Sequence, residues 1–210
     1  MPVHRYHHGN LHTALLQAGL RAARVGGPAA LQLRELAAAS GVSPSAVYRH
    51  FPDMAHLSAE VSRSARETLA NAMLSAAEAV VEDPDDAGIG AIRRLHAIGR
   101  AYIEFAESEP QLFDTAFMTA GAAPSCADDP SAWEVLNAAL DALVETGELH
   151  ASRRHEAPLI AWSAVHGMSG VLVRKMLPEP YRPEQAISAT LAGVRDALHL
   201  RHPPEFAVAR

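Results

Sequence analysis

The sequence contains almost no cysteine and few aromatic residues. Its one cysteine, Cys126, has no second cysteine in the chain with which to form a disulfide, which is typical of proteins in a reducing compartment. Aromatic residues make up 5% of the chain, whereas 49% of its residues are hydrophobic, chiefly alanine and leucine. Runs of β-branched residues in strict alternation are also missing. The composition therefore predicts an all-α protein.

Segments that would direct the chain to a membrane or a catalytic function are missing as well. No stretch approaches the roughly 18 uninterrupted apolar residues of a membrane span, and residues 1–10 are polar and rich in histidine where a secretory signal has an apolar core. The sequence has no glycine-rich phosphate loop, serine nucleophile elbow or zinc-protease spacing. We expect a cytoplasmic protein that is not an enzyme, with no cofactor and no membrane partner.

Charge is distributed unevenly along the chain. The net charge is −6, yet residues 1–60 hold five arginines against only Glu35, Asp53 and Glu60. The first part is therefore weakly basic and the remainder is acidic. This polarity is expected when one end of a protein meets phosphate groups.

Residues 33–57 predict two short helices joined by a tight turn. The first helix contains the apolar Leu36 and ends at Gly41, because glycine is favoured where a helix end turns left-handed. The second begins with Ser43 in the N-cap position and Pro44 in the first helical position, where a missing N–H costs nothing. This is the layout of a helix-turn-helix, whose second helix enters the DNA major groove.

The second helix has one apolar side and one polar side. Val47 and Phe51 share its inward side, which leaves Ser45, Tyr48, Arg49 and His50 facing outward. An arginine can contact guanine or a phosphate, and tyrosine and histidine suit phosphate oxygens. Pro44 and Ser45 are placed to graze base edges. The sequence thus predicts contact with double-stranded DNA.

These residues resemble the TetR family of bacterial transcriptional regulators. The family pattern occurs here as Leu36-Ala37, Gly41-Val42-Ser43 and Tyr48-Arg49-His50-Phe51, with matching flanks from Tyr6-His7-His8-Gly9-Asn10-Leu11 to Leu57. The segment from Ala161 to Gly167 is similar to the Trp…His-Gly helix of one TetR subgroup. Two positions depart from the pattern: Gln32 replaces a threonine or serine that reaches a phosphate, and Met54 replaces a lysine. The predicted DNA-binding residues are Gln32, Ser43, Pro44, Ser45, Tyr48, Arg49 and His50.

The rest of the chain predicts a helical bundle. A continuous helical pattern over residues 54–81 leaves no linker between the halves, so we predict a helix-turn-helix domain over residues 1–57 and a helical domain over residues 58–210. In the N-terminal part, a first helix is expected that Asn10 caps and Gly26 ends. After residue 81, five more helices are expected, over residues 89–107, 110–119, 133–146, 156–176 and 183–200. The resemblance implies a homodimer that represses transcription at a palindromic operator and is released when a small-molecule effector enters this bundle.

The aromatic residues of the predicted bundle are candidates for effector binding, and its small and apolar residues are candidates for the dimer interface. Most of the few aromatics fall in this half, as a mostly apolar pocket requires, and the candidate ligand-binding residues are Tyr102, Phe105, Phe113, Phe117, Trp133, Trp162 and His166. Apolar and small residues recur at helical spacing in the last two helices. These are the candidate dimer-interface residues: Ile160, Ala164, Gly167, Val171, Ile187, Leu191, Val194 and Leu198.

Two alternative functions remain open at this point. A metal-responsive regulator would use the N-terminal histidines His4, His7, His8 and His12, although no carboxylate or cysteine joins them. A small helical enzyme would have to use His166 as its catalytic group. These histidines can also have purely structural roles, which would exclude both alternatives. We expect no metal site.

Overall fold

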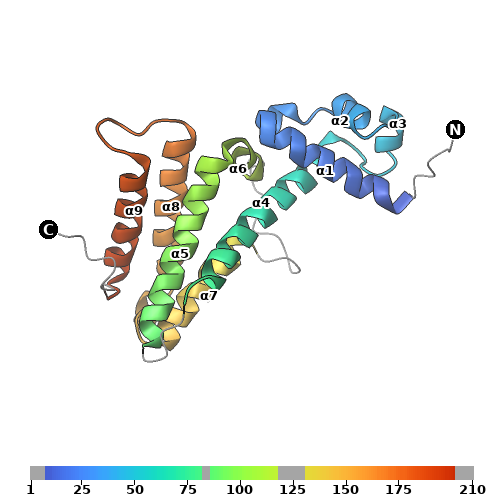
Figure 1. Cartoon of the computed structure of the whole chain (residues 1–210). Helices are drawn as coiled ribbons and strands as arrows, with labels where there is room; N and C mark the ends of the chain where they lie inside the picture. Colours follow the sequence, from blue (N-terminus) through green and yellow to red (C-terminus); the bar gives the residue numbers. More distant parts are fainter. Residues whose placement is uncertain (1–7, 82–85, 118–130, 202–210) are drawn as a thin grey trace. The chain divides into compact units, whose positions relative to one another are not determined.

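The computed structural model describes residues 8–81, 86–117 and 131–201, and all regular elements in these ranges are helices (Figure 1). None of these helices is both long and apolar enough to cross a membrane. The chain forms two compact units. The head unit comprises Met1–Arg66 and Glu109–Ser125, and the bundle unit comprises Glu67–Ser108 and Cys126–Arg210. The all-α fold predicted from composition is confirmed.

The head unit is built around a small apolar core. It contains α1 (His8–Gly26), a 3-10 turn η1 (Gly27–Ala30), α2 (Leu33–Ala39), α3 (Pro44–Val47), the first part of α4 (Met54–Glu78), and α6 (Pro110–Ala116). Helix α1 contacts α2, η1 and α6, and α2 contacts α3. The buried core includes Leu15, Leu36, Val47, Phe51 and Leu57.

The bundle unit contains the remainder of α4 and four further α-helices. These are α5 (Ala87–Ser108), α7 (Ala132–Glu145), α8 (Ala157–Val173) and α9 (Pro183–Leu198), with a short 3-10 turn η2 (Ala151–Arg153) before α8. Helix α5 contacts α7, α8 and α9, and α8 runs beside α9 (Figure 1). Helix α5 is therefore central to this unit.

Local sequence signals explain where most helices begin and end. Gly41 has a φ of +69°, as expected for the turn after α2. Helix α7 begins one residue earlier than predicted, because Ser131 and Glu134 form a reciprocal capping box at its start. Helix α9 ends at Leu198 rather than residue 200, because His199 adopts the left-handed conformation with a φ of +60°.

Two expectations about helices in the head unit were wrong. Asn10 lies inside α1 rather than capping it, because the helix already includes His8. Helix α3 covers only Pro44–Val47, and residues 48–50 continue as a turn in which the N–H groups of Arg49 and His50 bond to carbonyls three residues back. The segment after α3 thus winds more tightly than an α-helix.

The role of α6 was also not foreseen from the sequence. This helix begins two residues after α5 ends, yet it packs against α1 and η1 in the head unit. Its last carbonyl, on Ala116, accepts hydrogen bonds from Ser62 Oγ at 3.0 Å and Arg66 Nη1 at 2.8 Å, both on α4. The chain therefore leaves the bundle unit after α5, and α6 is held in the head unit by these hydrogen bonds and packing contacts.

Candidate nucleic-acid interface and effector cavity

The outward side of the helix-turn-helix is a short polar surface, which we call the recognition segment (residues 43–50). Tyr48 is 56% exposed, and Ser43, Pro44, Ser45 and Arg49 are exposed as well. Val47 is fully buried beneath them, and Phe51 is 1% exposed. The buried pair fixes the backbone, so the exposed side chains project from a rigid support.

Capping at the start of α3 differs in detail from the prediction. Ser43 occupies the N-cap position with extended backbone angles, but its side chain makes no capping hydrogen bond to the backbone of the helix. Its hydroxyl instead lies 2.9 Å from that of Ser45. Gln32 occupies the N-cap position of α2, also without a side-chain cap. Neither N-cap side chain therefore caps its helix, so a phosphate oxygen would not have to displace such a cap to approach either helix start.

His12 supports the recognition segment from behind. Its ring, on α1, stacks on Phe51 with centroids 4.7 Å apart and lies edge-on to His50 at 6.5 Å. Its Nε2 atom is 3.2 Å from a carboxylate oxygen of Glu60 on α4. His12 therefore joins α1, the end of the recognition segment and α4. Sequence reasoning had considered it only as a metal ligand.

The start of α4 has its own cap, formed by Asp53. Asp53 Oδ1 accepts a hydrogen bond from the backbone N–H of His56 at 2.9 Å and lies 2.9 Å from His56 Nδ1. These contacts lower the pKa of Asp53, with the side-chain bond to His56 as the largest cause. Aspartate is one of the residue types that are favoured at the N-cap position of a helix. Asp53 and His56 flank Met54 at the start of this helix, and Met54 is the position at which the family pattern has a lysine.

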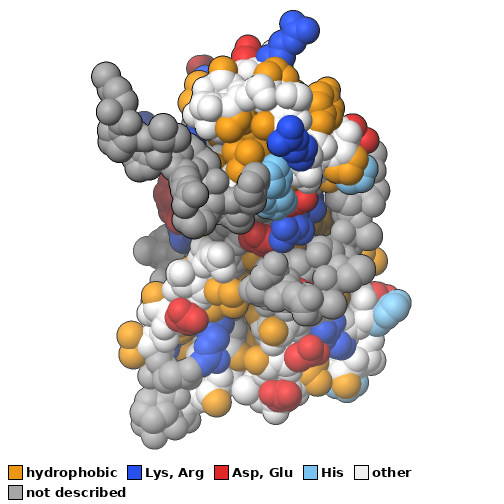
Figure 2. All heavy atoms as spheres, turned by 90° about the vertical axis from the view of Figure 1, so that its right-hand side faces the viewer, with side chains coloured by type: hydrophobic (Ala, Val, Ile, Leu, Met, Phe, Trp, Pro, Cys, Tyr) orange, Lys and Arg blue, Asp and Glu red, His pale blue; other side chains and the backbone are white. Residues whose placement is uncertain are grey.

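Positive charge on the described surface is dispersed. On the face seen in Figure 2, lysine or arginine side chains and histidines form separate patches among hydrophobic and uncharged atoms. Within residues 8–60 the arginines are Arg21, Arg24, Arg34 and Arg49, and Arg24 pairs with Glu109 at 3.4 Å. Electrostatic attraction to phosphates from one head unit is thus limited.

The bundle unit contains a mostly apolar cavity of about 40 Å³. Helix α5 supplies six of its lining residues, and α8, α9, α7, α4 and the segment after α9 supply the rest. The lining consists of Met73, Ile92, Leu95, His96, Ile98, Gly99, Tyr102, Leu136, Ala161, Trp162, Val165, Leu191, Val194, Arg195 and Leu200. An apolar lining with a few polar residues is typical of small-molecule sites, although such sites usually have larger volumes of about 300–1,000 Å³.

One wall of the cavity is continuous with an aromatic cluster. The Tyr102 hydroxyl lies 2.8 Å from His166 Nδ1. Trp162 stacks on His166 at 5.9 Å and meets Tyr102 and Trp133 edge-on at 5.4 and 5.6 Å. Burial raises the pKa of Tyr102 far above its ordinary value. Burial, followed by the charge of Arg174, lowers the pKa of His166. Both groups are therefore neutral at pH 7, which lets the hydroxyl donate to an unprotonated Nδ1.

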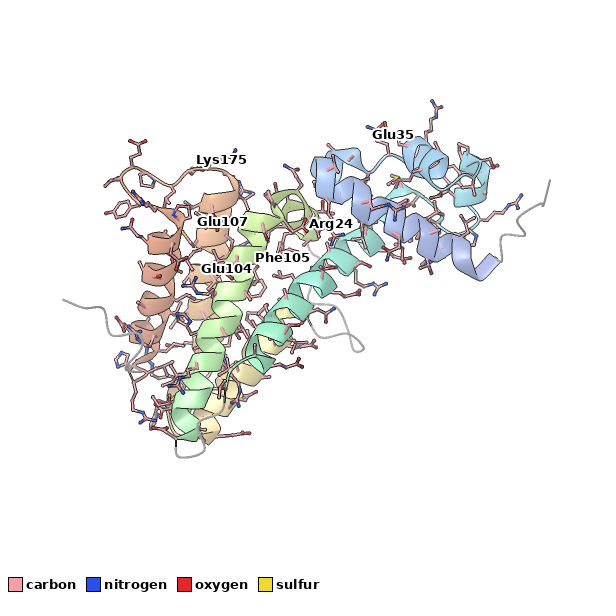
Figure 3. All side chains as sticks on the ribbon, in the orientation of Figure 1. Arg24, Glu35, Glu104, Phe105, Glu107 and Lys175 are labelled. Carbon is pink, nitrogen blue, oxygen red and sulfur yellow. The ribbon has the colours of Figure 1, made fainter. Side chains whose placement is uncertain are left out.

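The predicted ligand-binding residues separate into three groups. Tyr102 and Trp162 line the cavity, and His166 and Trp133 contact these two. Phe105 is buried on α5 beside the exposed Glu104 (Figure 3) but does not line the cavity. Phe113 and Phe117 lie in the head unit, where their rings are 5.0 Å apart. Sequence reasoning missed His96 and Arg195, the polar residues set into the apolar sides of α5 and α9.

The predicted dimer-interface residues also separate by helix. Those on α9 are buried within their own subunit, because this stripe faces α5 and α8: Ile187, Leu191, Val194 and Leu198. Those on α8 are partly or fully exposed: Ile160, Ala164, Gly167 and Val171. The outward side of α9 instead carries Ala189 and Gly193. A Cβ atom added at Gly167 or Gly193 would meet no heavy atom within 4 Å.

The histidines do not form a metal site among the residues that the structure describes. No three His, Cys, Asp or Glu side chains there come together as a potential ligand group. His4 and His7, two members of the proposed N-terminal group, lie outside the described residues.

Two family models match the chain. Residues 15–61 match the model described as bacterial regulatory proteins, tetR family, and residues 95–194 match the tetracyclin repressor-like C-terminal domain. No curated protein matches the sequence.

Solved structures share the fold along almost the whole chain. A protein of unknown function from Rhodococcus sp. RHA1 is 24% identical with a TM-score of 0.69, covering 93% of this chain and 99% of that one. The TetR-family regulator PfmR from Thermus thermophilus is 21% identical with a TM-score of 0.52, covering 90% and 99%. AibR, solved in complex with isovaleryl coenzyme A and operator DNA, is 15% identical with a TM-score of 0.53, covering 87% and 97%.

Both family models fall on the parts of the fold described above. The first spans the helix-turn-helix, and the second spans most of α5 through α9 with most of the residues that line the cavity. Together with the all-helical fold, they identify the chain as a member of the TetR family of bacterial regulatory proteins, a DNA-binding transcriptional regulator.

Proposed function

We propose that the protein is a homodimeric repressor that binds a palindromic operator and is released by a small molecule bound in the cavity of the bundle unit. The observation that carries the DNA-binding part is the recognition segment, where Tyr48 and Arg49 are exposed above the buried Val47 and Phe51. Arg49 supplies a fork of donors for guanine or phosphate, and Tyr48 supplies a hydroxyl for phosphate.

The weak basic charge of the head unit supports a dimer. A single head with dispersed arginines makes few phosphate contacts, and joining two heads raises affinity by about 10²–10⁴-fold through effective concentration. In a symmetric dimer the two recognition segments would have to enter successive major grooves about 34–36 Å apart. A palindromic operator follows from this two-fold symmetry.

We assign the dimer contact to the outward sides of α8 and α9. Ala164 and Gly167 on α8, with Ala189 and Gly193 on α9, place small residues on these partly or fully exposed sides. Small side chains allow helices of a second subunit to approach closely. The larger apolar residues of α9 hold the subunit together from within, so dimerisation and internal packing use opposite sides of the same helix.

Helix α6 offers a route from the cavity to the head unit. Six cavity residues lie on α5, which leads directly into α6. Helix α6 in turn is tied to α4 through Ser62, Arg66 and the Ala116 carbonyl. A ligand that shifts α5 would move α6 and thereby the part of α4 around Ser62 and Arg66, which belongs to the head unit. For release, the ligand must favour the non-DNA conformation, typically by about 1–3 kcal/mol.

Two further points concern the domain boundary and the role of His166. The domain boundary stays a prediction near residue 57, within the continuous helix α4. We propose no catalytic role for His166, since its Nδ1 atom is engaged by the Tyr102 hydroxyl and its ring by Trp162. Both contacts hold the imidazole in place within the aromatic cluster.

Footprinting on DNA selected from random sequence tests the proposal. We expect the selected sites to be palindromic, with half-sites centred one helical turn apart and protection of both halves at the same protein concentration. Selection of single, unpaired half-sites would contradict the dimer. Failure to select any sequence above background would contradict operator binding itself.

A further inference from the structure

The exposed side chains of the recognition segment lie on a support that is too short to hold its own shape. Helix α3 has four residues and ends at Val47, so Tyr48, Arg49 and His50 lie in the tight turn that follows it. Isolated helices shorter than about 12–15 residues are marginal in water, and most helical stability in proteins comes from packing against other elements. The conformation of this turn therefore depends on what holds its two ends, Val47 and Phe51.

Backbone hydrogen bonds join the two ends of the turn. The N–H groups of His50 and Phe51 both bond to the carbonyl oxygen of Val47, at 2.9 and 3.0 Å. Because His50 directly precedes Phe51, a rotation of the backbone at Phe51 would change the directions of His50 and Arg49. The position of the Phe51 ring thus sets the directions of the two side chains before it.

The ring of His12, on α1, covers Phe51. The two rings are stacked, with centroids 4.7 Å apart and planes 21° from parallel. The same imidazole lies edge-on to the ring of His50 at 6.5 Å. Stacked rings prefer a narrow range of relative positions. His12 therefore holds Phe51 in place and also contacts the last residue of the recognition segment.

Glu60, on α4, fixes the orientation of the His12 ring. The Nε2 atom of His12 is 3.2 Å from a carboxylate oxygen of Glu60, and the Nη2 atom of Arg63 is 4.0 Å from the same oxygen. An ionised carboxylate only accepts hydrogen bonds, so Nε2 carries the hydrogen in either protonation state of the imidazole. The ring is consequently held by its face on Phe51 and by its edge on α4.

We propose that His12 is a positioning residue for DNA reading, which holds Phe51 in place and so fixes the directions of Arg49 and His50 at the operator. Loss of this hold should reduce the preference for the operator over other DNA more than it reduces the general attraction to phosphates, because base contacts carry the sequence information. This inference rests on the DNA-reading role proposed for the recognition segment.

The ratio of operator affinity to scrambled-duplex affinity tests this role in the full-length protein. Both affinities are measured by fluorescence anisotropy at one salt concentration, so the attraction to phosphates that is common to both duplexes cancels. In a protein that circular dichroism shows to be folded, His12→Ala should lower the ratio about tenfold, as expected for one misplaced base contact.

A matched control removes the same side chain from the bundle unit. His155→Ala, at an exposed position, should leave the ratio unchanged. An unchanged ratio in folded His12→Ala protein, or an equal loss of affinity for both duplexes, would overturn the proposal.

Conservative variants test the contact with Glu60 and remain informative if His12→Ala does not fold. His12→Phe keeps a ring on Phe51 but has no N–H for Glu60, and Glu60→Ala removes the acceptor; each should lower the ratio about threefold. Glu60→Gln retains an acceptor oxygen and should keep the native ratio. Glu60→Ala should have no further effect in the His12→Phe protein, because the contact is already lost there. Equal effects of Glu60→Ala in the native and His12→Phe proteins would contradict the proposal.

Arg49→Ala distinguishes failure of this inference from failure of the proposed function. If Arg49→Ala lowers the ratio and His12→Ala does not, the recognition segment reads DNA and the positioning role of His12 fails. If neither variant lowers the ratio, the recognition segment is not the DNA-reading surface, and the proposed role of that segment fails as well.

Discussion

Gly167 offers a sharp test of the proposed dimer, because the subunit itself tolerates a side chain there. A Cβ atom at this position of α8 would meet no heavy atom within 4 Å. Alanine in a helix interior is more favourable than glycine by about 0.5–1 kcal/mol, so Gly167→Ala should stabilise an isolated subunit by about that amount. Gly167→Arg should likewise leave the fold of the subunit intact.

The two variants should differ in assembly. If α8 meets its symmetry mate at Gly167, an arginine there adds a bulky charge at close-packed backbone, and the dimer should dissociate. Loss of the second head should then weaken operator binding by about 10²–10⁴-fold. Ala138→Arg, on the surface of α7, adds the same charge elsewhere and should remain dimeric.

Light scattering coupled to size exclusion measures the mass, and circular dichroism measures the thermal midpoint. A folded Gly167→Arg protein that stays dimeric and binds operator with native affinity would refute this placement of the interface. A folded Ala138→Arg protein that becomes monomeric would show that added charge alone disrupts assembly, and would also refute the reasoning.

Three other changes test the core, the α6 contact and the buried histidine. Phe51→Ala should lower the free energy of unfolding by about 3–5 kcal/mol, measured by urea denaturation, because the ring is buried and stacks on His12. Ser62→Ala should cost about 1 kcal/mol in the same assay and weaken ligand-induced DNA release, since it removes one of two donors to the Ala116 carbonyl. The thermal midpoint should fall as pH decreases from 7 to 5, because the lowered pKa of His166 means that the unfolded chain binds more protons in that range than the folded chain does. His166→Gln should reduce this dependence on pH. The same pH dependence in a folded His166→Gln protein would contradict this role of His166.

Local signals in the sequence predicted the elements of this fold well. Gly41, Ser43 and Pro44 act through backbone preferences of single residues, and the positions they predict for a turn and a helix start are confirmed. The length of α3 was overestimated, because the tight winding after Val47 depends on how Phe51 packs into the core. Helix periodicity marks an apolar side but does not say what that side meets.

The bundle unit illustrates this limit. The stripe containing Leu191 and Val194 was predicted to face a partner, yet it faces α5 and α8 of its own subunit. Phe113 is a predicted ligand-binding residue because it falls, with most of the aromatics, in the C-terminal half of the sequence, but its helix α6 belongs to the head unit. Arg195 was not selected, since its burial depends on contacts among helices that are distant in sequence.

The most direct test of the account is the affinity of the purified protein for its selected operator when Arg49 is replaced. The account predicts that Arg49→Ala weakens operator binding about 10–100-fold at fixed salt, corresponding to about 1–3 kcal/mol for a lost base contact. Arg21→Ala, which removes the same charge from an exposed position on α1, should weaken binding much less. Native operator affinity in a folded Arg49→Ala protein would contradict the assignment of residues 43–50 as the DNA-reading surface.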